Sequence, residues 1–296
     1  MFISNQWKDY QIIDAGDGEK LERWGNITVR RPDPGVIWPR TKPDSVWQKC
    51  HMHYHRSKAG GGKWEHKKKT PDQWTMAYKD LTFNIRPTDF KHMGLFPEQA
   101  TNWDWTAGLI KSAKASSDKP IKILNLFGYT GGATVSCLNA GASVTHIDAA
   151  KGMNNWAKSN IQTSNVEGQN CRIITDDVHK FVQRELRRGS YYDGIMMDPP
   201  SYGRGPSGEV WKLENLLYDL IKHTVAILND KPLFFLLNTY TTGFTATAAE
   251  NVLKMCLEER DVMVQSIASG PLVIPVSDSN VVLPCGSTVR CKFDTV

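Results

Sequence analysis

A glycine-rich stretch in the middle of the chain has the residue types of a small-ligand turn. Asn-Leu-Phe-Gly-Tyr-Thr-Gly-Gly (125–132) follows an apolar run at 121–124 and opens a helix-like segment at 133–140. Glycines between a buried strand and a helix N-terminus let the backbone approach a ligand closely, although the same glycines could serve the turn alone. Their spacing is not the G-x-G-x-x-G of dinucleotide-binding turns. The candidate cofactor-binding residues here are Asn125, Phe127, Gly128 and Gly131.

Acidic residues end two later apolar runs. Asp148 lies 20 residues beyond Gly128, a position from which a carboxylate can hold ribose hydroxyls. Asp177 follows the next predicted strand, and Asp176 is an alternative to it. Asp148 and Asp177 could each instead cap the helix that follows it, because aspartate is favoured at the N-cap position. Ligands of parallel α/β sheets collect outside the carboxyl ends of the strands, so we expect these residues to share one site.

A third strand ends in Asp-Pro-Pro-Ser-Tyr (198–202), which we interpret as the catalytic segment. Two prolines remove backbone donors and stiffen the exit from the strand without an obvious structural gain. The Asp198 carboxylate and the Pro199 carbonyl can accept hydrogen bonds from the amino or imino group of a nucleobase, and Tyr202 can stack on the ring of that nucleobase. Arg204 could contact a phosphate or be a solvated loop charge. The candidate catalytic residues are Asp198, Pro199, Pro200 and Tyr202.

Alternating strands and helices position these residues. We expect strands at 121–126, 143–147, 171–175, 192–197, 232–238 and 262–268, and helices at 97–113, 131–140, 152–162, 178–188, 213–229 and 244–259. This alternation predicts an α/β fold with a Rossmann-like, mostly parallel seven-stranded sheet covered on both faces. The last segment, 281–293, is expected to return as an antiparallel edge strand.

The N-terminal 90 residues differ from the rest of the chain in their predicted secondary structure. Short β-like pieces at 10–13, 27–30, 36–38, 75–78 and 81–85 alternate with glycine- and proline-rich turns, and a loose basic excursion is expected around 55–70. We therefore predict two domains, a small β-rich module (1–90) and a catalytic domain (91–296). Residues 40–80 hold ten Lys or Arg and four acids, a net charge of +6 against −1 for the rest. Positive charge interleaved with Trp47, Tyr54, Trp64 and Trp74 suits a nucleic acid, although a basic stretch can also be a solvated loop.

Composition indicates an ordinary globular protein rather than a membrane or disulfide-rich one. The chain of 296 residues is 40% hydrophobic and 23% charged, and its longest apolar runs are far too short to cross a bilayer. The six cysteines show no C-x-x-C spacing, and no secretory signal is visible. We therefore expect a reducing, cytoplasmic location without a membrane partner.

The stretch Cys-His-Met-His-Tyr-His (50–55) invites a metal interpretation, because three histidines at alternate positions of a strand share one face. Apart from His66, no second ligand cluster with zinc spacing follows. We therefore predict no metal and favour histidines that contact RNA phosphate or are simply exposed.

Residues 75–296 resemble the bacterial 23S ribosomal RNA methyltransferases of class I, a family that includes cytosine-C5 and guanine-N7 enzymes. The resemblance lies in the segments 95–99, 125–132, 148–151, 176–178 and 198–202. It implies S-adenosylmethionine as the cofactor, with Phe96 and Gln99 closing over its methionine end, Asp148 holding its ribose and Asp177 its adenine. It also implies that the segment from Asp198 to Tyr202 holds the target base. The N-terminal stretch is similar to a subgroup with a small β module in place of a PUA domain.

This sequence differs from the family's cytosine-C5 enzymes in one residue that their reaction needs. Cytosine-C5 methylation needs a thiolate that adds to the ring, and the family's cytosine enzymes carry that cysteine after the strand that follows Asp-Pro-Pro. Here the matching segment, Leu-Asn-Thr-Tyr-Thr-Thr (237–242), has no cysteine. We therefore predict transfer of a methyl group to a base nitrogen of RNA, 23S rRNA or a ribosomal precursor. The alternatives are a methyltransferase for a protein or small molecule and a non-catalytic ribosome-assembly factor that binds S-adenosylmethionine.

Overall fold

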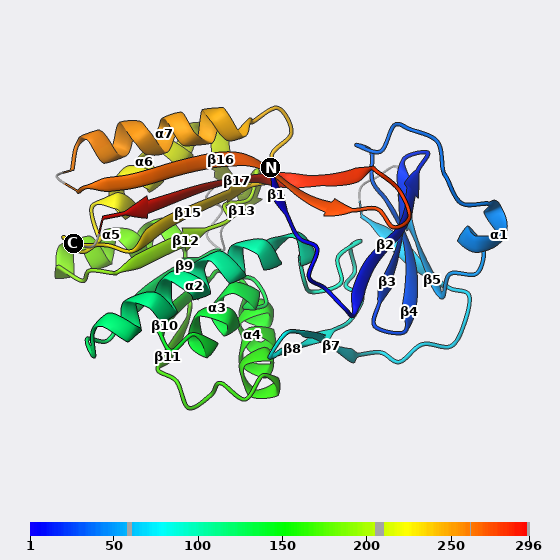
Figure 1. The fold of residues 1–296 in the computed structure, drawn as a ribbon, viewed down its shortest axis with the longest axis horizontal. Helices are drawn as coiled ribbons and strands as arrows, with labels where there is room; N and C mark the ends of the chain where they lie inside the picture. Colours follow the sequence, from blue (N-terminus) through cyan, green and yellow to red (C-terminus); the bar gives the residue numbers. More distant parts are fainter. Residues whose placement is uncertain (58–60, 205–209, 261, 295–296) are drawn as a thin grey trace. The chain divides into compact units, whose positions relative to one another are not determined.

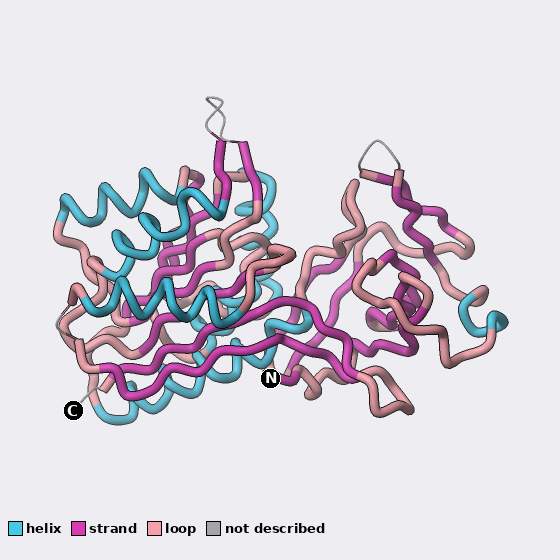
Figure 2. Tube along the Cα trace, turned by 90° about the horizontal axis from the view of Figure 1, so that it is seen from above, coloured by secondary structure: helices cyan, strands magenta, loops and turns pink. Residues whose placement is uncertain are grey.

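A computed structural model describes residues 1–57, 61–204, 210–260 and 262–294, with the backbone alone described at 204. The chain forms two compact units. The larger unit comprises Met1–Phe2, Asn102–Leu272 and Gly286–Val296, and the smaller unit comprises Ile3–Thr101 and Val273–Cys285. Figure 2 shows that helices are concentrated in the larger unit, whereas the smaller one consists mainly of strands and loops. The functional division at residue 90 stays a prediction.

An eight-stranded sheet forms the centre of the larger unit, which confirms the predicted α/β class; the two-residue strand β1 (Phe2–Ile3) adds one strand to the seven predicted. The order of its strands is β1 (Phe2–Ile3), β16 (Val264–Pro275), β17 (Val282–Phe293), β15 (Phe234–Thr239), β12 (Gly194–Met197), β9 (Lys122–Leu126), β10 (Ser143–Asp148) and β11 (Cys171–Thr175). The five strands from β15 to β11 in this order pair in parallel, so a crossover connects each of them to the next one along the chain.

Helices cover both faces of this sheet (Figure 1). Phe181, Leu217 and Leu253, from three successive helices, share one buried cluster with sheet residues such as Leu124 and Leu237. The central strands β12 and β15 are buried along their whole length, as expected for strands covered on both faces. The helices are α2 (Ala100–Ser116), α3 (Gly132–Asn139), α4 (Lys151–Thr163), α5 (Val178–Arg188), α6 (Leu213–Val225) and α7 (Ala246–Glu258).

The prediction of an edge strand at 281–293 was wrong in one respect. β17 is antiparallel to β15, as expected, but it lies between β15 and β16 inside the sheet. β16 extends to Pro275, beyond the expected end at 268, and β17 begins only seven residues later. β16 and the short β1 therefore occupy positions further toward the edge than β17.

The smaller unit contains a five-stranded sheet, β2-β3-β4-β5-β6, and a separate hairpin of β7 and β8. The predicted strand at 36–38 is absent, and three strands were not predicted because polar residues interrupt their patterns: β3, β5 and β6. The excursion expected around 55–70 includes parts of two paired strands, β5 and β6, with a register from Met52↔His66 to Arg56↔Gly62, and its residues 58–60 lie outside the described part of the chain. The elements are β2 (Tyr10–Gly16), β3 (Glu19–Trp24), β4 (Ile27–Pro32), α1 (Asp44–Trp47), β5 (Met52–Arg56), β6 (Gly62–His66), β7 (Trp74–Tyr78), β8 (Leu81–Ile85) and the 3₁₀ turn η1 (Pro97–Gln99).

A buried ionic network stabilises the smaller unit. The Glu22 side chain is 0% exposed, and its carboxylate accepts two hydrogen bonds from Arg31, at 2.5 and 2.6 Å, and one from Tyr10 at 2.6 Å. Burial alone would raise the pKa of Glu22, but the charges of Arg31 and Lys20 and these hydrogen bonds outweigh it and hold the pKa at about 2. Removing the carboxylate would therefore leave a buried guanidinium without its counterion.

Among the described residues, no helix is both long and apolar enough to span a membrane.

Candidate active site

The turn after β9 has the backbone conformation that a close-fitting ligand loop requires. Phe127 and Tyr129 have φ values of 56° and 52°, and Gly131, the N-cap of α3, has a φ of 84°. The Gly128 N–H donates to the Ile147 carbonyl at 2.9 Å, so the turn is joined to the adjacent strand β10. Positive φ is uncommon outside glycine, and its concentration in one turn marks a functional candidate.

Three buried side chains, those of His146, Thr134 and Asn125, lie next to the turn. A Cβ atom at Gly128 would lie 2.3 Å from the His146 ring, so this position admits no side chain without rearrangement. His146 Nδ1 lies 2.8 Å from Thr134 Oγ1, which also accepts a hydrogen bond from Asn125 at 2.9 Å. Burial lowers the pKa of His146 to about 4, so the ring is neutral. Asn125 therefore helps to hold the turn in place, and its proposed contact with the cofactor stays a prediction.

Asp148 joins the turn to the end of β10. Its Oδ2 accepts a hydrogen bond from the Tyr129 N–H at 2.9 Å, and its Oδ1 accepts one from the Ala150 N–H at 2.8 Å. Burial raises the pKa of Asp148 even though these two bonds act to lower it. A carboxylate offers about four lone-pair sites. Further donors such as ribose hydroxyls would therefore stabilise its charged form.

The two acids after β11 both have partners in the protein. Asp177 caps α5, because its side chain accepts a hydrogen bond from the Lys180 N–H at 2.8 Å. Asp176 forms an ion pair with Arg184. Asp177 thus caps the helix, which was the alternative interpretation of this residue. The contact of Asp177 with the adenine of the cofactor stays a prediction. Thr175 pairs with Asp148, so the carboxyl ends of β10 and β11 lie side by side.

The Asp-Pro-Pro segment leaves the sheet on the other side of the glycine turn. Met197, the last residue of β12, pairs with Leu126, the last residue of β9. Asp198 is half-buried, Pro199 is buried and Pro200 is exposed, and Tyr202 is 51% exposed. The chain order reverses between β9 and β12, which is the switch point where ligands of such sheets bind. The register thus brings the glycine turn, Asp148 and Asp198 to one edge.

Sequence reasoning missed Trp211. Its indole N–H donates to the Pro200 carbonyl, and its ring lies 5.7 Å from that of Phe127. Trp211 lies in β14 (Val210–Lys212), which pairs with β13 (Tyr202–Arg204). One aromatic residue therefore connects the exit of Asp-Pro-Pro to the cofactor turn. The available sequence signal was a lone tryptophan shortly after Tyr202. The side chain of Arg204 lies outside the described part of the chain.

Phe96 and Gln99 belong to the smaller unit. Gln99 is buried at the end of η1, and its N–H donates to the Phe96 carbonyl at 3.0 Å. Their proposed closure over the methionine end of the cofactor stays a prediction.

The exposure of the basic stretch, residues 40–80, agrees only in part with its interpretation as a nucleic-acid contact. Lys63 and the three lysines at 67–69 are exposed, as a surface for a polyanion requires. Trp47 and Tyr54, by contrast, are 1% and 4% exposed and belong to the core, so they offer no stacking face. Trp64 and Trp74 are half-buried with their indole N–H groups bonded to backbone carbonyls. The charges are therefore available at this surface, and two of the four aromatic residues are not.

None of the cysteines in the larger unit is poised for catalysis. All six cysteines are free and lie among the described residues. Burial raises the pKa of Cys137 and Cys291 to about 12 and that of Cys171 and Cys256 to about 11, so these thiols are protonated at neutral pH. Burial therefore disfavours the thiolate form of all four cysteines in the larger unit.

Comparison with known proteins gives a family match over more than half of the chain. The sequence model of the S-adenosylmethionine-dependent methyltransferases matches residues 48–224. A solved SAM-dependent methyltransferase from Agrobacterium tumefaciens is 36% identical, with a TM-score of 0.91, and the alignment covers 98% of this chain and 92% of that one.

Curated relatives match a shorter region. Ribosomal RNA large subunit methyltransferase K/L from Syntrophotalea carbinolica is 26% identical over 155 residues, which is 52% of this chain and 20% of the relative. Ribosomal RNA large subunit methyltransferase I from Enterobacter sp. is 34% identical over 85 residues, which is 28% of this chain and 22% of the relative. The aligned regions thus span about a fifth of the length of these curated relatives.

Proposed function

The chain belongs to the S-adenosylmethionine-dependent methyltransferase family, and from this premise we propose that it methylates a base nitrogen of RNA. The proposed RNA is 23S rRNA or a ribosomal precursor, and the proposed location is the cytoplasm. The observation that carries the proposal is the juxtaposition of the glycine turn, Asp148 and Asp198-Pro-Pro at the switch point of one sheet.

The residues present fit S-adenosylmethionine. Positive φ at Phe127, Tyr129 and Gly131 lets the backbone come close to a small molecule, and Asp148 retains acceptor capacity for a ribose. When bound, S-adenosylmethionine supplies a methyl group carried on a positively charged sulfur. The protein's contribution is then chiefly to hold the acceptor in line with that group and to exclude other geometries.

Asp198 is the residue we assign to the acceptor. Its carboxylate accepts a hydrogen bond from an N–H of the target nitrogen and takes the proton that this nitrogen releases after it forms the new bond to carbon. Trp211 holds the Pro200 carbonyl, which fixes the path of the chain immediately after Asp198. Tyr202 is exposed and can stack on the base.

Nitrogen is favoured over carbon as the acceptor atom by the state of the cysteines. Carbon-5 methylation needs a thiolate close to the base, and the four thiols of this unit have pKa values raised to about 11 or 12. A nitrogen lone pair needs no such activation.

RNA as the substrate class is supported by two observations. The curated relatives are ribosomal RNA methyltransferases by name, and the smaller unit exposes Lys63 and the lysines at 67–69. Lysines that neutralise phosphates supply sequence-independent affinity, which suits a large folded RNA.

The experiment combines methyl transfer with nucleoside analysis. Purified protein, labelled S-adenosylmethionine and unmodified 23S rRNA are incubated, and the digested nucleosides are identified by mass spectrometry. We expect an N-methylated base in the wild type. In Asp198→Asn we expect a loss of about 100-fold or more in kcat/KM for RNA, the usual share of a positioned acid or base, with the Kd for S-adenosylmethionine unchanged.

Asp118→Asn is the matched control, because Asp118 is an exposed carboxyl group in the loop before β9. It should methylate RNA at the wild-type rate. Transfer at the wild-type rate in Asp198→Asn would remove Asp198 from the acceptor site. Intact cofactor binding without RNA methylation would contradict the proposal: transfer to a protein or small molecule would then indicate that substrate class, and no transfer at all a non-catalytic binding protein.

A further inference from the structure

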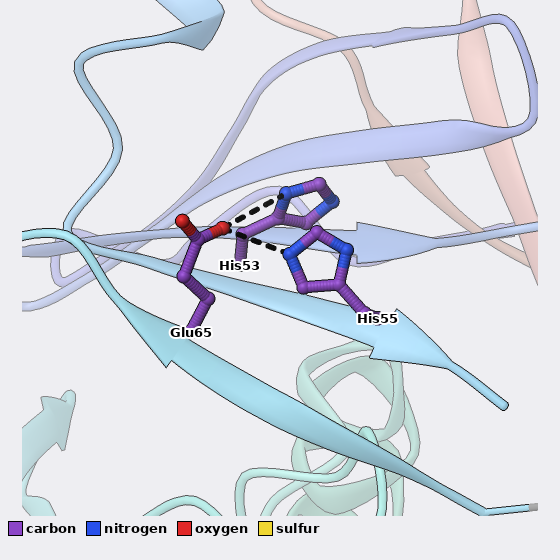
Figure 3. A group of neighbouring side chains, drawn as sticks. All are labelled: His53, His55 and Glu65. Atoms are coloured by element: carbon purple, nitrogen blue, oxygen red, sulfur yellow. Dashed lines mark hydrogen bonds and ion pairs between the residues drawn. The ribbon is translucent and has the colours of Figure 1, made fainter.

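Two histidines and a glutamate converge on the β5–β6 hairpin of the smaller unit (Figure 3). His53 and His55 alternate along β5 and therefore share one face of the sheet, with ring centroids 3.9 Å apart. Glu65 lies on β6 directly opposite His53 in the antiparallel register. His51 does not join them, because it precedes β5 and its Nδ1 lies 2.8 Å from Thr28 Oγ1. The three side chains come from two strands whose pairing holds them together.

The ligand atoms are spaced as the ligands of one metal ion are. One ligand atom each from His53, His55 and Glu65 lies within 4.8 Å of the other two. Glu65 Oε2 is 2.8 Å from His55 Nε2 and 4.0 Å from His53 Nδ1. Zinc binds imidazole nitrogen and carboxylate oxygen at about 2.0–2.2 Å, so two ligands of a tetrahedral ion are roughly 3.3 Å apart. The observed separations lie on both sides of that value. Without the ion, the 2.8 Å contact is a hydrogen bond from His55 Nε2–H to the Glu65 carboxylate, so metal binding takes the place of that proton, which moves to Nδ1 of the same ring or to solvent.

A second carboxylate orients His53 toward the same point. His53 Nε2 lies 3.0 Å from Glu19 Oε1. A carboxylate only accepts, so Nε2 carries the proton of the neutral ring and Nδ1, which faces Glu65, keeps its lone pair. Arg30 and Arg40 donate to Glu19 Oε2 and neutralise its charge. A carboxylate behind a ligating histidine is the usual outer partner at protein metal sites, where it fixes both tautomer and ring orientation.

We propose that His53 Nδ1, His55 Nε2 and the Glu65 carboxylate bind one divalent transition-metal ion, with zinc as the best match. Two imidazoles and one carboxylate suit zinc, and three protein ligands leave one position for water or an outside donor. His53 is 8% exposed, whereas His55 and Glu65 face solvent, so an ion could enter without opening the fold. The histidine pattern alone favoured no metal, because Glu65 becomes a third ligand only through the strand register.

The ion would cross-link β5 and β6, because it would bind His53 and His55 on one strand and Glu65 on the other, close to the end of β6 at His66. The exposed lysines at 67–69 follow β6 directly, so the cross-link would stabilise the strand that precedes them. All three proposed ligands belong to the smaller unit, whereas Asp148 and Asp198 belong to the larger one.

The test measures zinc binding to the full chain. Protein stripped with EDTA and dialysed is titrated with ZnCl₂ in competition with a chromogenic chelator, and Co²⁺ is added separately as a spectroscopic probe. We expect one equivalent of tightly bound zinc and a visible Co²⁺ spectrum of low coordination number. His55→Gln and Glu65→Gln should weaken zinc binding by about 100-fold or more, since each removes a direct ligand, and Glu19→Gln by about 10- to 100-fold.

His66→Gln is the matched control. His66 is an exposed histidine at the end of β6, and its Nδ1 lies 3.1 Å from Thr70 Oγ1, away from the cluster. It should bind zinc as the wild type does. Wild-type protein without an equivalent of tight zinc, or wild-type affinity in both His55→Gln and Glu65→Gln, would overturn the proposal. An equal loss in His66→Gln would do the same, because it would place the ion elsewhere. Unchanged S-adenosylmethionine affinity in every variant verifies that the larger unit is folded.

Discussion

Replacing Asp148 by asparagine should weaken S-adenosylmethionine binding by about 10- to 100-fold while the protein stays folded. Each Asp148 oxygen already accepts one backbone N–H, from Tyr129 and from Ala150, and has about one lone pair left for a ribose hydroxyl. Asparagine turns one of these oxygens into a donor and removes the charge. One charge-assisted hydrogen bond is worth about 1.5–3 kcal/mol, which corresponds to the stated loss in affinity.

The same substitution should have only a modest effect on stability. It removes one of the two backbone hydrogen bonds, at a cost of about 1 kcal/mol, and it also relieves the burial of a charge. For a unit of this size that cost lowers the Tm by about 2–4 °C. Asp148→Ala, which loses both oxygens, should bind S-adenosylmethionine more weakly than Asp148→Asn.

The pH dependence gives an independent readout. Burial raises the pKa of Asp148, and a ribose diol prefers the ionised carboxylate, so binding must weaken as the pH falls through that raised pKa. The weakening should begin at a higher pH than an ordinary aspartate would show. Asp148→Asn has no carboxyl group to titrate and should lack this component.

Titration calorimetry at several pH values measures both effects, with Asp118→Asn as the exposed-carboxylate control and thermal unfolding as the check on folding. Affinity within about threefold of the wild type in a folded Asp148→Asn variant would refute the assignment of Asp148 to the cofactor, since even a weak charge-assisted bond is worth about tenfold.

Three further predictions concern other parts of the chain. Replacing the lysines at 67–69 by glutamate should weaken binding to every RNA tested and flatten the slope of log affinity against log salt, because fewer counterions are released; equal slopes in filter binding would exclude this surface. Glu22→Gln should destabilise the smaller unit by about 3–5 kcal/mol at pH 7 in urea unfolding, because Arg31 keeps its buried charge. The pKa of Glu22 is lowered from 4.5 to about 2, so the wild-type advantage should be complete above pH 4.5 and disappear as the pH falls toward 2; an advantage independent of pH would contradict this. Gly128→Ala should lower the Tm and weaken S-adenosylmethionine binding, because the new methyl group meets the His146 ring. Gly152→Ala, in the first turn of α4 where a Cβ meets nothing, should leave binding unchanged and should not lower the Tm.

Much of the larger unit could be predicted from local sequence patterns. α5 was predicted at 178–188 and runs from Val178 to Arg188, and β9 was predicted at 121–126 and runs from Lys122 to Leu126. Uninterrupted apolar runs identify strands buried on both faces, and a glycine or acidic residue after such a run marks the strand end. The positions of Asp148 and Asp198 at strand ends followed from these signals alone.

The smaller unit was harder to predict because its strands carry mixed residues. His-Tyr-His-Arg in β5 and Lys-Trp-Glu-His in β6 lack a clean apolar alternation, because burial does not alternate along them: β5 is buried at three successive residues and then exposed, and no residue of β6 is fully buried. The basic stretch around Trp47 predicts a surface aromatic residue, whereas the structure places Trp47 in the core beside Leu21 and Cys50. Tryptophan is suited to both environments, so the sequence could not decide between them.

The sequence by itself determined which residues could do chemistry and at which strand ends they lie. Only the tertiary structure decided which partners these residues have: Tyr129 for Asp148, His146 beneath Gly128, Trp211 against Pro200 and Phe127, and Glu65 opposite His53. A strand end is a local property, because it depends on a few neighbouring residues. A cross-strand or loop-to-loop partner depends on register and on crossovers between distant segments, which one-dimensional patterns do not contain.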